Sequence, residues 1–411
     1  MDSLYYTTLL GLFATYCGYR YLYACHIRSK LDHIPTVGSS GIFSSYSTAW
    51  RFFKDGHTVI EEGCKKYGSA FKIPTLDGWQ VILNGPKMLE DMKKAPENEL
   101  SVLKAFVDII KADYTLSPES MINPYHIEVV RTPLTRNIGA RFADVRDEIV
   151  AAIDDNFPSE YDWVEMSVIK PIQNVVVRAS NRLLVDLPLC RDKDYCELNI
   201  QFTIDVITDA IKIGLFPRFM HPVVGPLISK GKVNVKRAMK HLTPLIQERL
   251  ELLSEHGSEW EDKPNDYITW LIETSEQLGA DWQRGSIKDF AVRVLGVNFA
   301  AIHTTSTAVT HALYHLAAHP EIIPKLREEV EEVTAREGWT KVAMVQLKIM
   351  DSFIKETQRV SGGGATIMLR IATKDFTFSD GTFIPAGTSV TLASHVVHQS
   401  ERPLTPQGSL T

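Results

Sequence analysis

The sequence predicts a mainly α-helical protein with a minor β part. From Pro86 to about Val360, apolar residues recur at the spacing of helices, and short β-rich runs lie on either side of this region. The 411 residues are 44% hydrophobic and 23% charged, values typical of globular proteins. These proportions exclude disorder, collagen and coiled coil as descriptions of the whole chain, which is long enough to bury a large core.

The first 25 residues predict a membrane anchor. Residues 4–25 contain one charged residue, Arg20, and are about as long as a helix that spans a bilayer. His26, Arg28 and Lys30 follow, so the positive-inside rule places the rest of the chain in the cytosol. A buried first helix is the alternative interpretation.

A hinge and two short strands follow the predicted anchor. Residues 26–41 are basic and then rich in Pro, Gly and Ser, which predicts a hinge to a body that covers residues 42–398. Within this body, residues 70–73 and 79–83 are β-rich, and Asp77-Gly78 between them predicts a turn.

Prolines divide the helical region. Asn123-Pro124, Pro133 and Asp186-Leu187-Pro188 predict local breaks, because the residue before a proline avoids helical backbone. Residues 215–228 are apolar and proline-rich, and a basic run follows them. Two interpretations of this run stay open: the solvated face of a helix, which we prefer, or a basic collar beside an apolar loop that enters the bilayer.

One long helix is predicted from Ser286 to His319. Ser286 and Asp289 have the spacing of a capping box, and no proline occurs before Pro320. Residues 294–302 are apolar on every side, so the helix is expected to run through the centre of the protein.

Four hydroxyl residues, 304–307, follow this apolar middle. Such residues compete for backbone carbonyls and tend to bend or open a helix. With the small residues Ala300 and Ala301 beside them, they fit either a ligand that approaches the backbone or ordinary packing with hydroxyls bonded to the preceding turn. His303 adds a group that exchanges protons near neutral pH.

Three histidines follow on the same helix. His311, His315 and His319 are spaced by four residues and therefore share one face. With no cysteine or paired carboxylate to complete a metal site, surface histidines are the preferred interpretation.

Glu356 and Arg359 are spaced to pair on a helix predicted over residues 351–360. The spacing alone carries little information, since Glu128 and Arg131 share it. The second pair is distinguished by its setting, because a glycine run and Arg370 follow it.

The pattern returns to β structure near the C-terminus. Residues 376–384 predict a hairpin with a turn at Asp380-Gly381, and residues 389–392 predict another strand. Residues 399–411 form a tail that fits no pattern.

Several function classes are excluded. The 44 basic and 50 acidic residues leave a formal charge of −6, so there is no basic surplus to bind nucleic acid. The chain contains no nucleophile elbow, H-E-x-x-H pair, dinucleotide fingerprint or phosphate loop, which leaves hydrolase and NAD-dependent functions without support.

Three motifs in order resemble the haem-thiolate monooxygenases of the cytochrome P450 superfamily: residues 300–305 (AAIHTT), Glu356-x-x-Arg359 and residues 383–388 (FIPAGT). The resemblance is greatest to the fungal membrane-bound branch that includes ent-kaurene-oxidase-like enzymes. It implies the cytochrome P450 fold, a haem cofactor and an anchor in the endoplasmic reticulum membrane. It also implies oxidation of a lipophilic, terpenoid-like substrate, as in fungal secondary metabolism, with O2 and electrons from an NADPH-dependent reductase.

The resemblance also assigns roles to individual residues. Thr304 corresponds to the proton-delivering threonine, His303 stands where most members carry an acid, and Ala301 lies against the haem face. Arg370 and, less closely, Arg131 correspond to arginines that bind the haem propionates. Glu356 and Arg359 correspond to a structural pair that braces the haem-binding core.

One part of the family pattern is missing. The family's F-x-x-G-x-x-x-C-x-G segment supplies the thiolate ligand of the iron, yet no cysteine follows Cys196 here. We therefore expect a chain that stops before the haem-cysteine motif and its last helices, that has no metal ligand, and that is inactive as given. The alternative is a non-catalytic, membrane-tethered helical remnant that binds a partner or an apolar ligand without haem.

Overall fold

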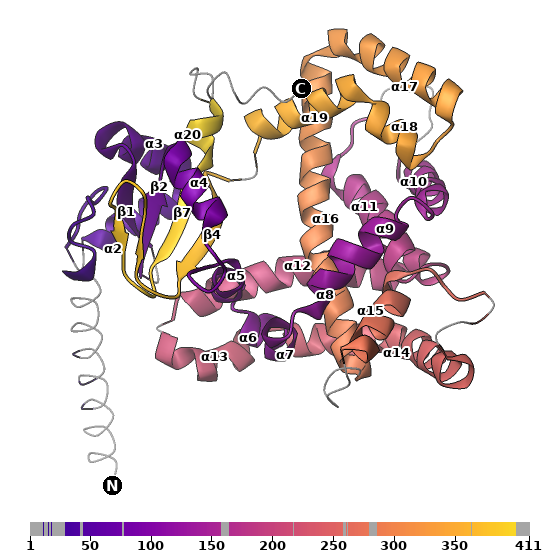
Figure 1. The fold of residues 1–411 in the computed structure, drawn as a ribbon, viewed down its shortest axis with the longest axis horizontal. Helices are drawn as coiled ribbons and strands as arrows, with labels where there is room; N and C mark the ends of the chain where they lie inside the picture. The colour runs from indigo at the N-terminus through magenta and orange to yellow at the C-terminus, as the bar shows by residue number, and fades with distance from the viewer. Residues whose placement is uncertain are drawn as a thin grey trace. The chain divides into compact units, whose positions relative to one another are not determined.

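The computed structural model confirms a mainly helical protein with a small β part (Figure 1). It describes residues 29–399, except for 42–43, 76–77, 158–163, 217, 258–259, 261, 279–285 and 363, together with the single positions 11, 15 and 18. The chain forms two compact units. The sheet unit comprises Met1–Asp108 and Gly364–Thr411, and the helical unit comprises Ile109–Gly363.

The predicted anchor and the tail beyond residue 399 lie outside the described residues, apart from positions 11, 15 and 18. Among the residues that are described, no helix combines the length and the apolar character needed to cross a bilayer.

The sheet unit contains a five-stranded sheet in the order β1-β2-β7-β4-β3. Only β2 and β7 run parallel among its neighbouring strands. A separate two-stranded hairpin is formed by β5 and β6. The strands are β1 (Ala70–Thr75), β2 (Gly78–Leu83), β3 (Leu100–Ser101), β4 (Thr366–Ala372), β5 (Phe376–Thr377), β6 (Phe383–Ile384) and β7 (Ser389–Ala393). The helices of this unit are α2 (Ser45–Lys54), α3 (Gly56–Tyr67), α4 (Pro86–Lys94) and α20 (Ser394–Gln399), and α5 (Val102–Ile110) leads out of it.

The predicted strands and hairpin are confirmed as β1, β2, β7 and the β5–β6 pair. Gly381 of the hairpin turn has φ of +89°, a conformation that glycine adopts without steric cost. The sequence did not predict β3 or β4. β4 contains an irregularity between Ile367 and Arg370, which interrupts the alternation by which strands are recognised.

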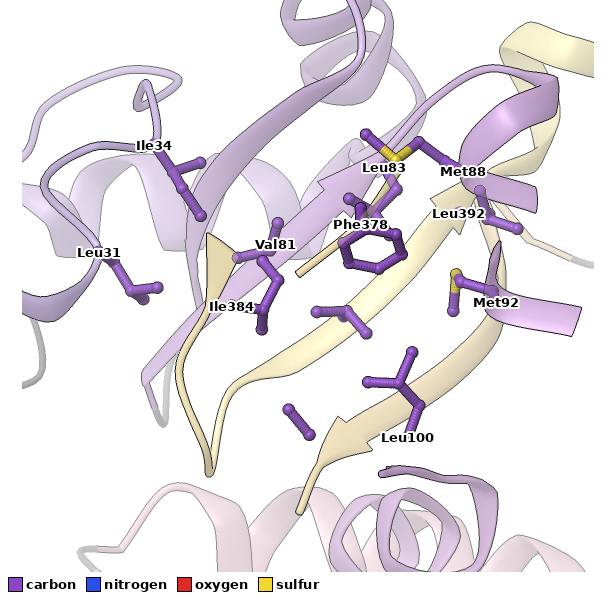
Figure 2. Packing of buried hydrophobic residues seen from close by; sticks show 12 residues of the cluster. Leu31, Ile34, Val81, Leu83, Met88, Met92, Leu100, Phe378, Ile384 and Leu392 are labelled. Atoms are coloured by element: carbon purple, nitrogen blue, oxygen red, sulfur yellow. The ribbon is translucent and has the colours of Figure 1, made fainter. Parts of the chain in front are cut away.

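Apolar side chains from both ends of the chain pack on this sheet (Figure 2). Val81 and Leu83 of β2 meet Leu392 of β7 in one buried cluster. Leu31 and Ile34, which belong to the predicted hinge, are also buried in it. The second half of residues 26–41 is therefore packed against the sheet unit.

The helical unit is built around α16 (Ile287–Ala318) (Figure 1). Helices α11, α12, α14 and α19 contact α16. The α-helices before it are α6 (Ala112–Thr115), α7 (Pro118–Ile122), α8 (Tyr125–Val129), α9 (Thr135–Asn137), α10 (Phe142–Asn156), α11 (Ile169–Leu184), α12 (Lys193–Gly214), α13 (His221–Ile228), α14 (Gly231–His256) and α15 (Tyr267–Gln277). Those after it are α17 (Ile323–Glu337), α18 (Lys341–Gln346) and α19 (Lys348–Val360). The short helices are η1 (Val130–Leu134, a π-helix), η2 (Leu189–Arg191), η3 (Arg218–Met220) and η4 (Pro320–Ile322).

The predicted long helix is confirmed almost to the residue. Ser286 caps α16 by accepting from the Asp289 N–H at 3.1 Å, whereas the Asp289 carboxylate turns toward other partners. Val294 and Leu295 are buried, as expected of a helix that passes through its unit.

The proline predictions have mixed outcomes. The chain leaves helical backbone before Pro124 and between α11 and η2, where Asp186 has φ of +60°. The break predicted at Pro133 is wrong, because η1 widens to a π-helix that carries this proline. Residues 221–228 form helix α13, and within the basic run that follows, Lys230 pairs with Asp205 at 2.8 Å.

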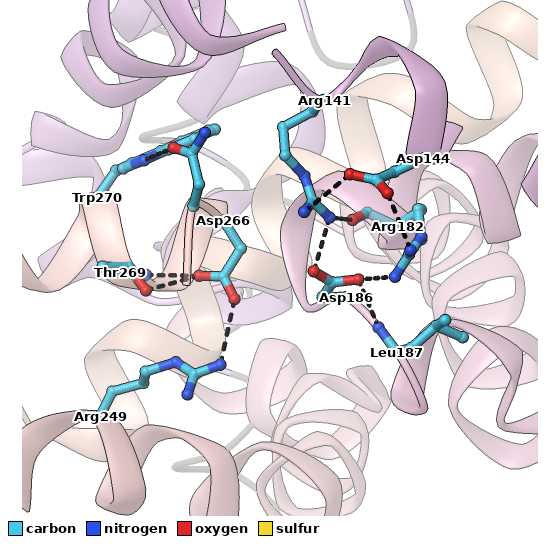
Figure 3. A network of polar contacts seen from close by, with 10 residues as sticks. Arg141, Asp144, Arg182, Asp186, Leu187, Arg249, Asp266, Thr269 and Trp270 are labelled. Carbon is cyan, nitrogen blue, oxygen red and sulfur yellow. Dashed lines mark hydrogen bonds and ion pairs between the residues drawn. The ribbon is translucent and has the colours of Figure 1, made fainter. Parts of the chain in front are cut away.

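Ion pairs join the start of α10 to the end of α11 (Figure 3). Arg141 binds Asp144 at 3.0 Å and Asp186 at 2.6 Å, and Arg182 binds both carboxylates as well. Both arginine side chains are largely buried, so each guanidinium needs these partners to offset its lost hydration.

Candidate functional site

The hydroxyl residues of α16 bond to the preceding turn of their own helix. Thr304 Oγ1 donates to the Ala300 carbonyl at 2.8 Å, and Ser306 Oγ donates to the Ile302 carbonyl at 2.6 Å. The helix stays continuous through this segment, and the hydroxyls of Thr304 and Ser306 have partners without opening it. Ser306 is buried, whereas Thr304 and Ala300 are exposed within the described residues, so one face of α16 is open at Thr304.

Ala301 is half-buried beside this face. Ala300 and Ala301 lie about one turn before Thr304, so only their methyl groups cover the backbone of α16 there. A flat ligand can therefore approach the helix closely here, which the packing of larger side chains would prevent.

His303 lies on a different side of α16 from Thr304, since consecutive helical residues are about 100° apart. Its Nε2 lies 3.0 Å from the Ile200 carbonyl of α12, and its Nδ1 lies 3.4 Å from Gln173 Nε2 of α11. A carbonyl only accepts, so Nε2 carries the proton and Nδ1 accepts from the Gln173 amide. The structure thus holds the His303 imidazole against α11 and α12 through both ring nitrogens.

Glu356 and Arg359 form the predicted pair on α19. Arg359 donates to the two carboxylate oxygens at 2.8 and 2.7 Å, and both side chains are exposed. The Arg359 hydrogen bonds lower the pKa of Glu356, and the positive charges of Arg359 and His315 act in the same direction.

The structure gives His311 and His315 a shared partner that the sequence did not predict. Both rings contact Ser361, the residue that ends α19, whereas His319 is exposed and contacts Glu321. The spacing of the histidines predicted their common face, but nothing local to them identifies a serine some 50 residues later in the chain.

The two predicted anion-binding arginines lie in different units. Arg370 of β4 is half-buried and donates to the Leu369 carbonyl at 3.0 Å. Burial lowers its pKa, and the carboxylate of Glu97 partly opposes this. Arg131 in η1 is exposed, and among the described residues no side chain bonds to it.

A buried cluster joins α16 to the segment that leads into Arg131. Arg293 Nε donates to Asp289 at 2.9 Å, and Arg293 Nη1 donates to His126 Nδ1 at 3.0 Å. Tyr125 OH donates to the same Asp289 carboxylate at 2.8 Å, and its ring lies 3.8 Å from the guanidinium. Burial, aided by the Arg293 charge, lowers the pKa of His126 to about 4. This cluster was not predicted from the sequence, in which the charged pair Asp289 and Arg293, spaced i, i+4 inside an apolar helix, was the available signal.

The three described cysteines, Cys64, Cys190 and Cys196, are free thiols that are buried or half-buried. Burial raises the pKa values of Cys64, Cys190 and Cys196 to about 11, so all three are neutral thiols near pH 7. Cys196 Sγ donates to the Cys190 carbonyl at 3.1 Å. Each predicted haem-contacting residue is thus described within its own unit: Arg370 in the sheet unit, and Arg131 and Thr304 in the helical unit.

Comparison with known proteins confirms the resemblance to cytochrome P450 at the level of the family. Residues 54–402 match the family described as Cytochrome P450. The chain is 41% identical to cytochrome P450 monooxygenase 151 of Postia placenta over 373 residues, which are 90% of this chain and 74% of the relative. It is 37% identical to cytochrome P450 monooxygenase 71 of the same fungus, over 97% of this chain and 78% of the relative. A cytochrome P450 monooxygenase of Ganoderma lucidum is 33% identical, over 90% of this chain and 72% of the relative.

Proposed function

The chain belongs to the cytochrome P450 family, whose members carry haem, and from this we propose that it contributes the oxygen-binding helix and haem-edge residues of a monooxygenase for a lipophilic, terpenoid-like substrate. Bound haem supplies the chemistry that inserts one atom of O2, with electrons from an NADPH-dependent reductase. The single observation that carries this proposal is the open face of α16 at Thr304, with alanines one turn before it.

Thr304 holds the proton that this site can deliver. Its hydroxyl donates to the Ala300 carbonyl, so a rotation about χ1 redirects the same proton toward the open face. His303 is bonded to Ile200 and Gln173 on another side of the helix. We therefore assign the direct proton donor to Thr304 and give His303 the role of holding α12 against α16.

The two arginines bind the propionate edges in this proposal. The Arg370 cation is half-buried and donates to a backbone carbonyl, an arrangement that a carboxylate would stabilise. Arg131 is exposed in η1, five residues after His126 of the buried Arg293 cluster. Glu356 and Arg359 brace α19, outside the reacting face.

A haem titration of the expressed chain tests these assignments. Arg370→Gln and Arg131→Gln are expected to weaken haem binding several-fold, because each removes one charge-assisted contact. Arg136→Gln is the matched control, since this exposed arginine lies one and a half turns beyond Arg131. Equal affinity in all three variants would rule out propionate binding by Arg370 and Arg131.

We further propose that these 411 residues alone do not catalyse monooxygenation. Oxygen activation depends on thiolate donation to iron. The support is the placement of Cys190 and Cys196, which are buried in the helical unit, where Cys196 Sγ donates to the Cys190 carbonyl. The test is the carbon-monoxide difference spectrum of the reduced chain. Absence of a thiolate-type Soret shift supports the proposal. A thiolate-type shift overturns it, and Cys64→Ala, Cys190→Ala and Cys196→Ala would then identify the ligand.

A haem-free, membrane-tethered binding role is the second candidate. It is favoured by exposed apolar side chains along α16, including Val309 and Leu313. The haem content of the purified chain separates the two candidates. Stoichiometric haem supports the monooxygenase proposal, whereas a folded chain that takes up no haem supports the second role.

Membrane attachment through residues 1–25, at the endoplasmic reticulum, belongs to the same proposal. Its support within the described residues is α2, where Trp50 and Phe53 stack at 5.7 Å and are about half exposed beside Lys54. Aromatic and basic side chains together are typical of membrane interfaces. Flotation with anionic lipid vesicles tests it, with residues 1–25 deleted in one variant and Trp50 and Phe53 replaced by Ser in another. A chain that does not float in any form would refute the attachment.

A further inference from the structure

Two histidines of α16 hold the residue that ends α19. His311 Nδ1 lies 3.0 Å from the carbonyl oxygen of Ser361, and His315 Nε2 lies 2.8 Å from Ser361 Oγ. The Ser361 N–H donates to the Thr357 carbonyl at 2.8 Å. Every polar group of Ser361 is therefore bonded, and two of the three bonds involve α16.

Ser361 lies between the end of α19 and a run of glycines. Three glycines follow it, and the helical unit ends within them, at Gly363. Glycine offers little resistance to backbone rotation. Ser361 is therefore the last residue with a side chain that can be held before the chain passes through these glycines to β4 and Arg370.

The histidines also relate this position to the open face of α16. His311 lies seven residues beyond Thr304, which is about two turns, or about 10 Å, along the same face. Helix α19, which ends at Ser361, carries Glu356 and Arg359. The contact at Ser361 thus joins the helix of the predicted oxygen site to the helix of the structural ion pair.

We propose that His311 and His315 are positioning residues that clamp the end of α19 to α16 through Ser361. The clamp keeps α19 in register with the Thr304 face and holds the end of α19 at the last residue before the glycines. This role goes beyond the proposed reaction and requires no haem, so it is tested independently of it.

The test is hydrogen–deuterium exchange of the full 411-residue chain, followed in peptides that contain the Ser361 amide. Exchange of this amide reports how often the end of α19 opens. His311→Phe and His315→Phe each remove one hydrogen bond and are expected to raise its exchange rate about five-fold, and the double variant about thirty-fold.

Replacing each histidine by Asn or Gln distinguishes a hydrogen-bonded clamp from general packing, because only one of the two amides reaches the position of the bonded ring nitrogen. Asn places an amide group where His Nδ1 lies, and Gln places one where His Nε2 lies. His311→Asn and His315→Gln are therefore expected to keep exchange near the wild-type rate, whereas His311→Gln and His315→Asn raise it. His319→Phe is the control on the same helix and leaves the rate unchanged, because His319 contacts Glu321 instead.

A second measurement isolates the side-chain bond. Ser361→Ala removes the partner of His315 and leaves the carbonyl partner of His311, so adding His315→Phe to Ser361→Ala should have no further effect. Unchanged exchange in the Phe variants, equal rescue by matched and mismatched amides, or full additivity with Ser361→Ala would each overturn the clamp. A rise spread evenly over all of α16 would do so too, since that pattern reports loss of the helix.

Discussion

His126 is expected to make the folded protein sensitive to mild acid. Its Nδ1 accepts from Arg293 at 3.0 Å in the buried cluster beside α16. Burial and the Arg293 charge lower its pKa from an ordinary 6.5 to about 4. Between these two values the unfolded chain binds a proton that the folded chain does not, so stability falls as the pH falls through this window.

The size of the effect follows from the shift. A pKa difference of one unit is worth about 1.4 kcal/mol, so lowering the pKa of His126 from 6.5 to about 4 contributes about 3 kcal/mol. This contribution to the unfolding free energy is present at pH 7 and is lost near pH 4. Below pH 4 the contribution of His126 becomes constant, since both states are then protonated.

His126→Asn provides the matched comparison. The Asn carbonyl accepts from Arg293 in place of Nδ1 but does not bind a proton in this range. Urea unfolding of both proteins at pH 4, 5, 6 and 7 gives the difference in stability between them. Carboxylates that titrate in the same range are common to both proteins and cancel.

The difference in unfolding free energy between the wild type and His126→Asn is expected to change by about 3 kcal/mol from pH 7 to pH 4. The stability of the variant is expected to depend less on pH. Parallel stability curves would refute the proposed neutral, buried state of His126.

Three further predictions concern single sites. Glu148 is fully buried and pairs with Arg178 at 2.5 Å, so Glu148→Ala should lower the unfolding free energy by about 3 kcal/mol, measured by urea denaturation; a loss below about 1 kcal/mol would contradict this. A Cβ added at Gly63 would lie 2.2 Å from the Phe71 ring, so Gly63→Ala should cost about 1–3 kcal/mol and lower the thermal midpoint, and an unchanged midpoint would mean that the ring moves freely. Thr304→Ala removes an exposed hydroxyl bonded within its own helix, so it should change stability by less than about 0.5 kcal/mol in the same urea assay, and a larger loss would show that Thr304 has a structural role.

Local patterns predicted the elements that carry the candidate site. The capping residue Ser286, the apolar middle and the absence of proline identified α16, because a helix depends on residues within about one turn of each other. The spacing of Glu356 and Arg359 identified their pair for the same reason. The β5–β6 hairpin was predictable because its strands are joined by a short turn.

Contacts between residues far apart in the sequence were not predicted. β4 joins the sheet through β7 and β3, and its irregular register removes the local alternation. Pro133 stays in helical backbone because η1 widens around it, an adjustment that its neighbours in sequence do not indicate.

The sequence by itself determined the family and the helix that bears Thr304. Only the tertiary structure decided that His303 faces α11 and α12, and that His311 and His315 share Ser361. The physical reason is that helical periodicity fixes the face a side chain occupies, whereas its partner is selected by the packing of segments far apart in the chain.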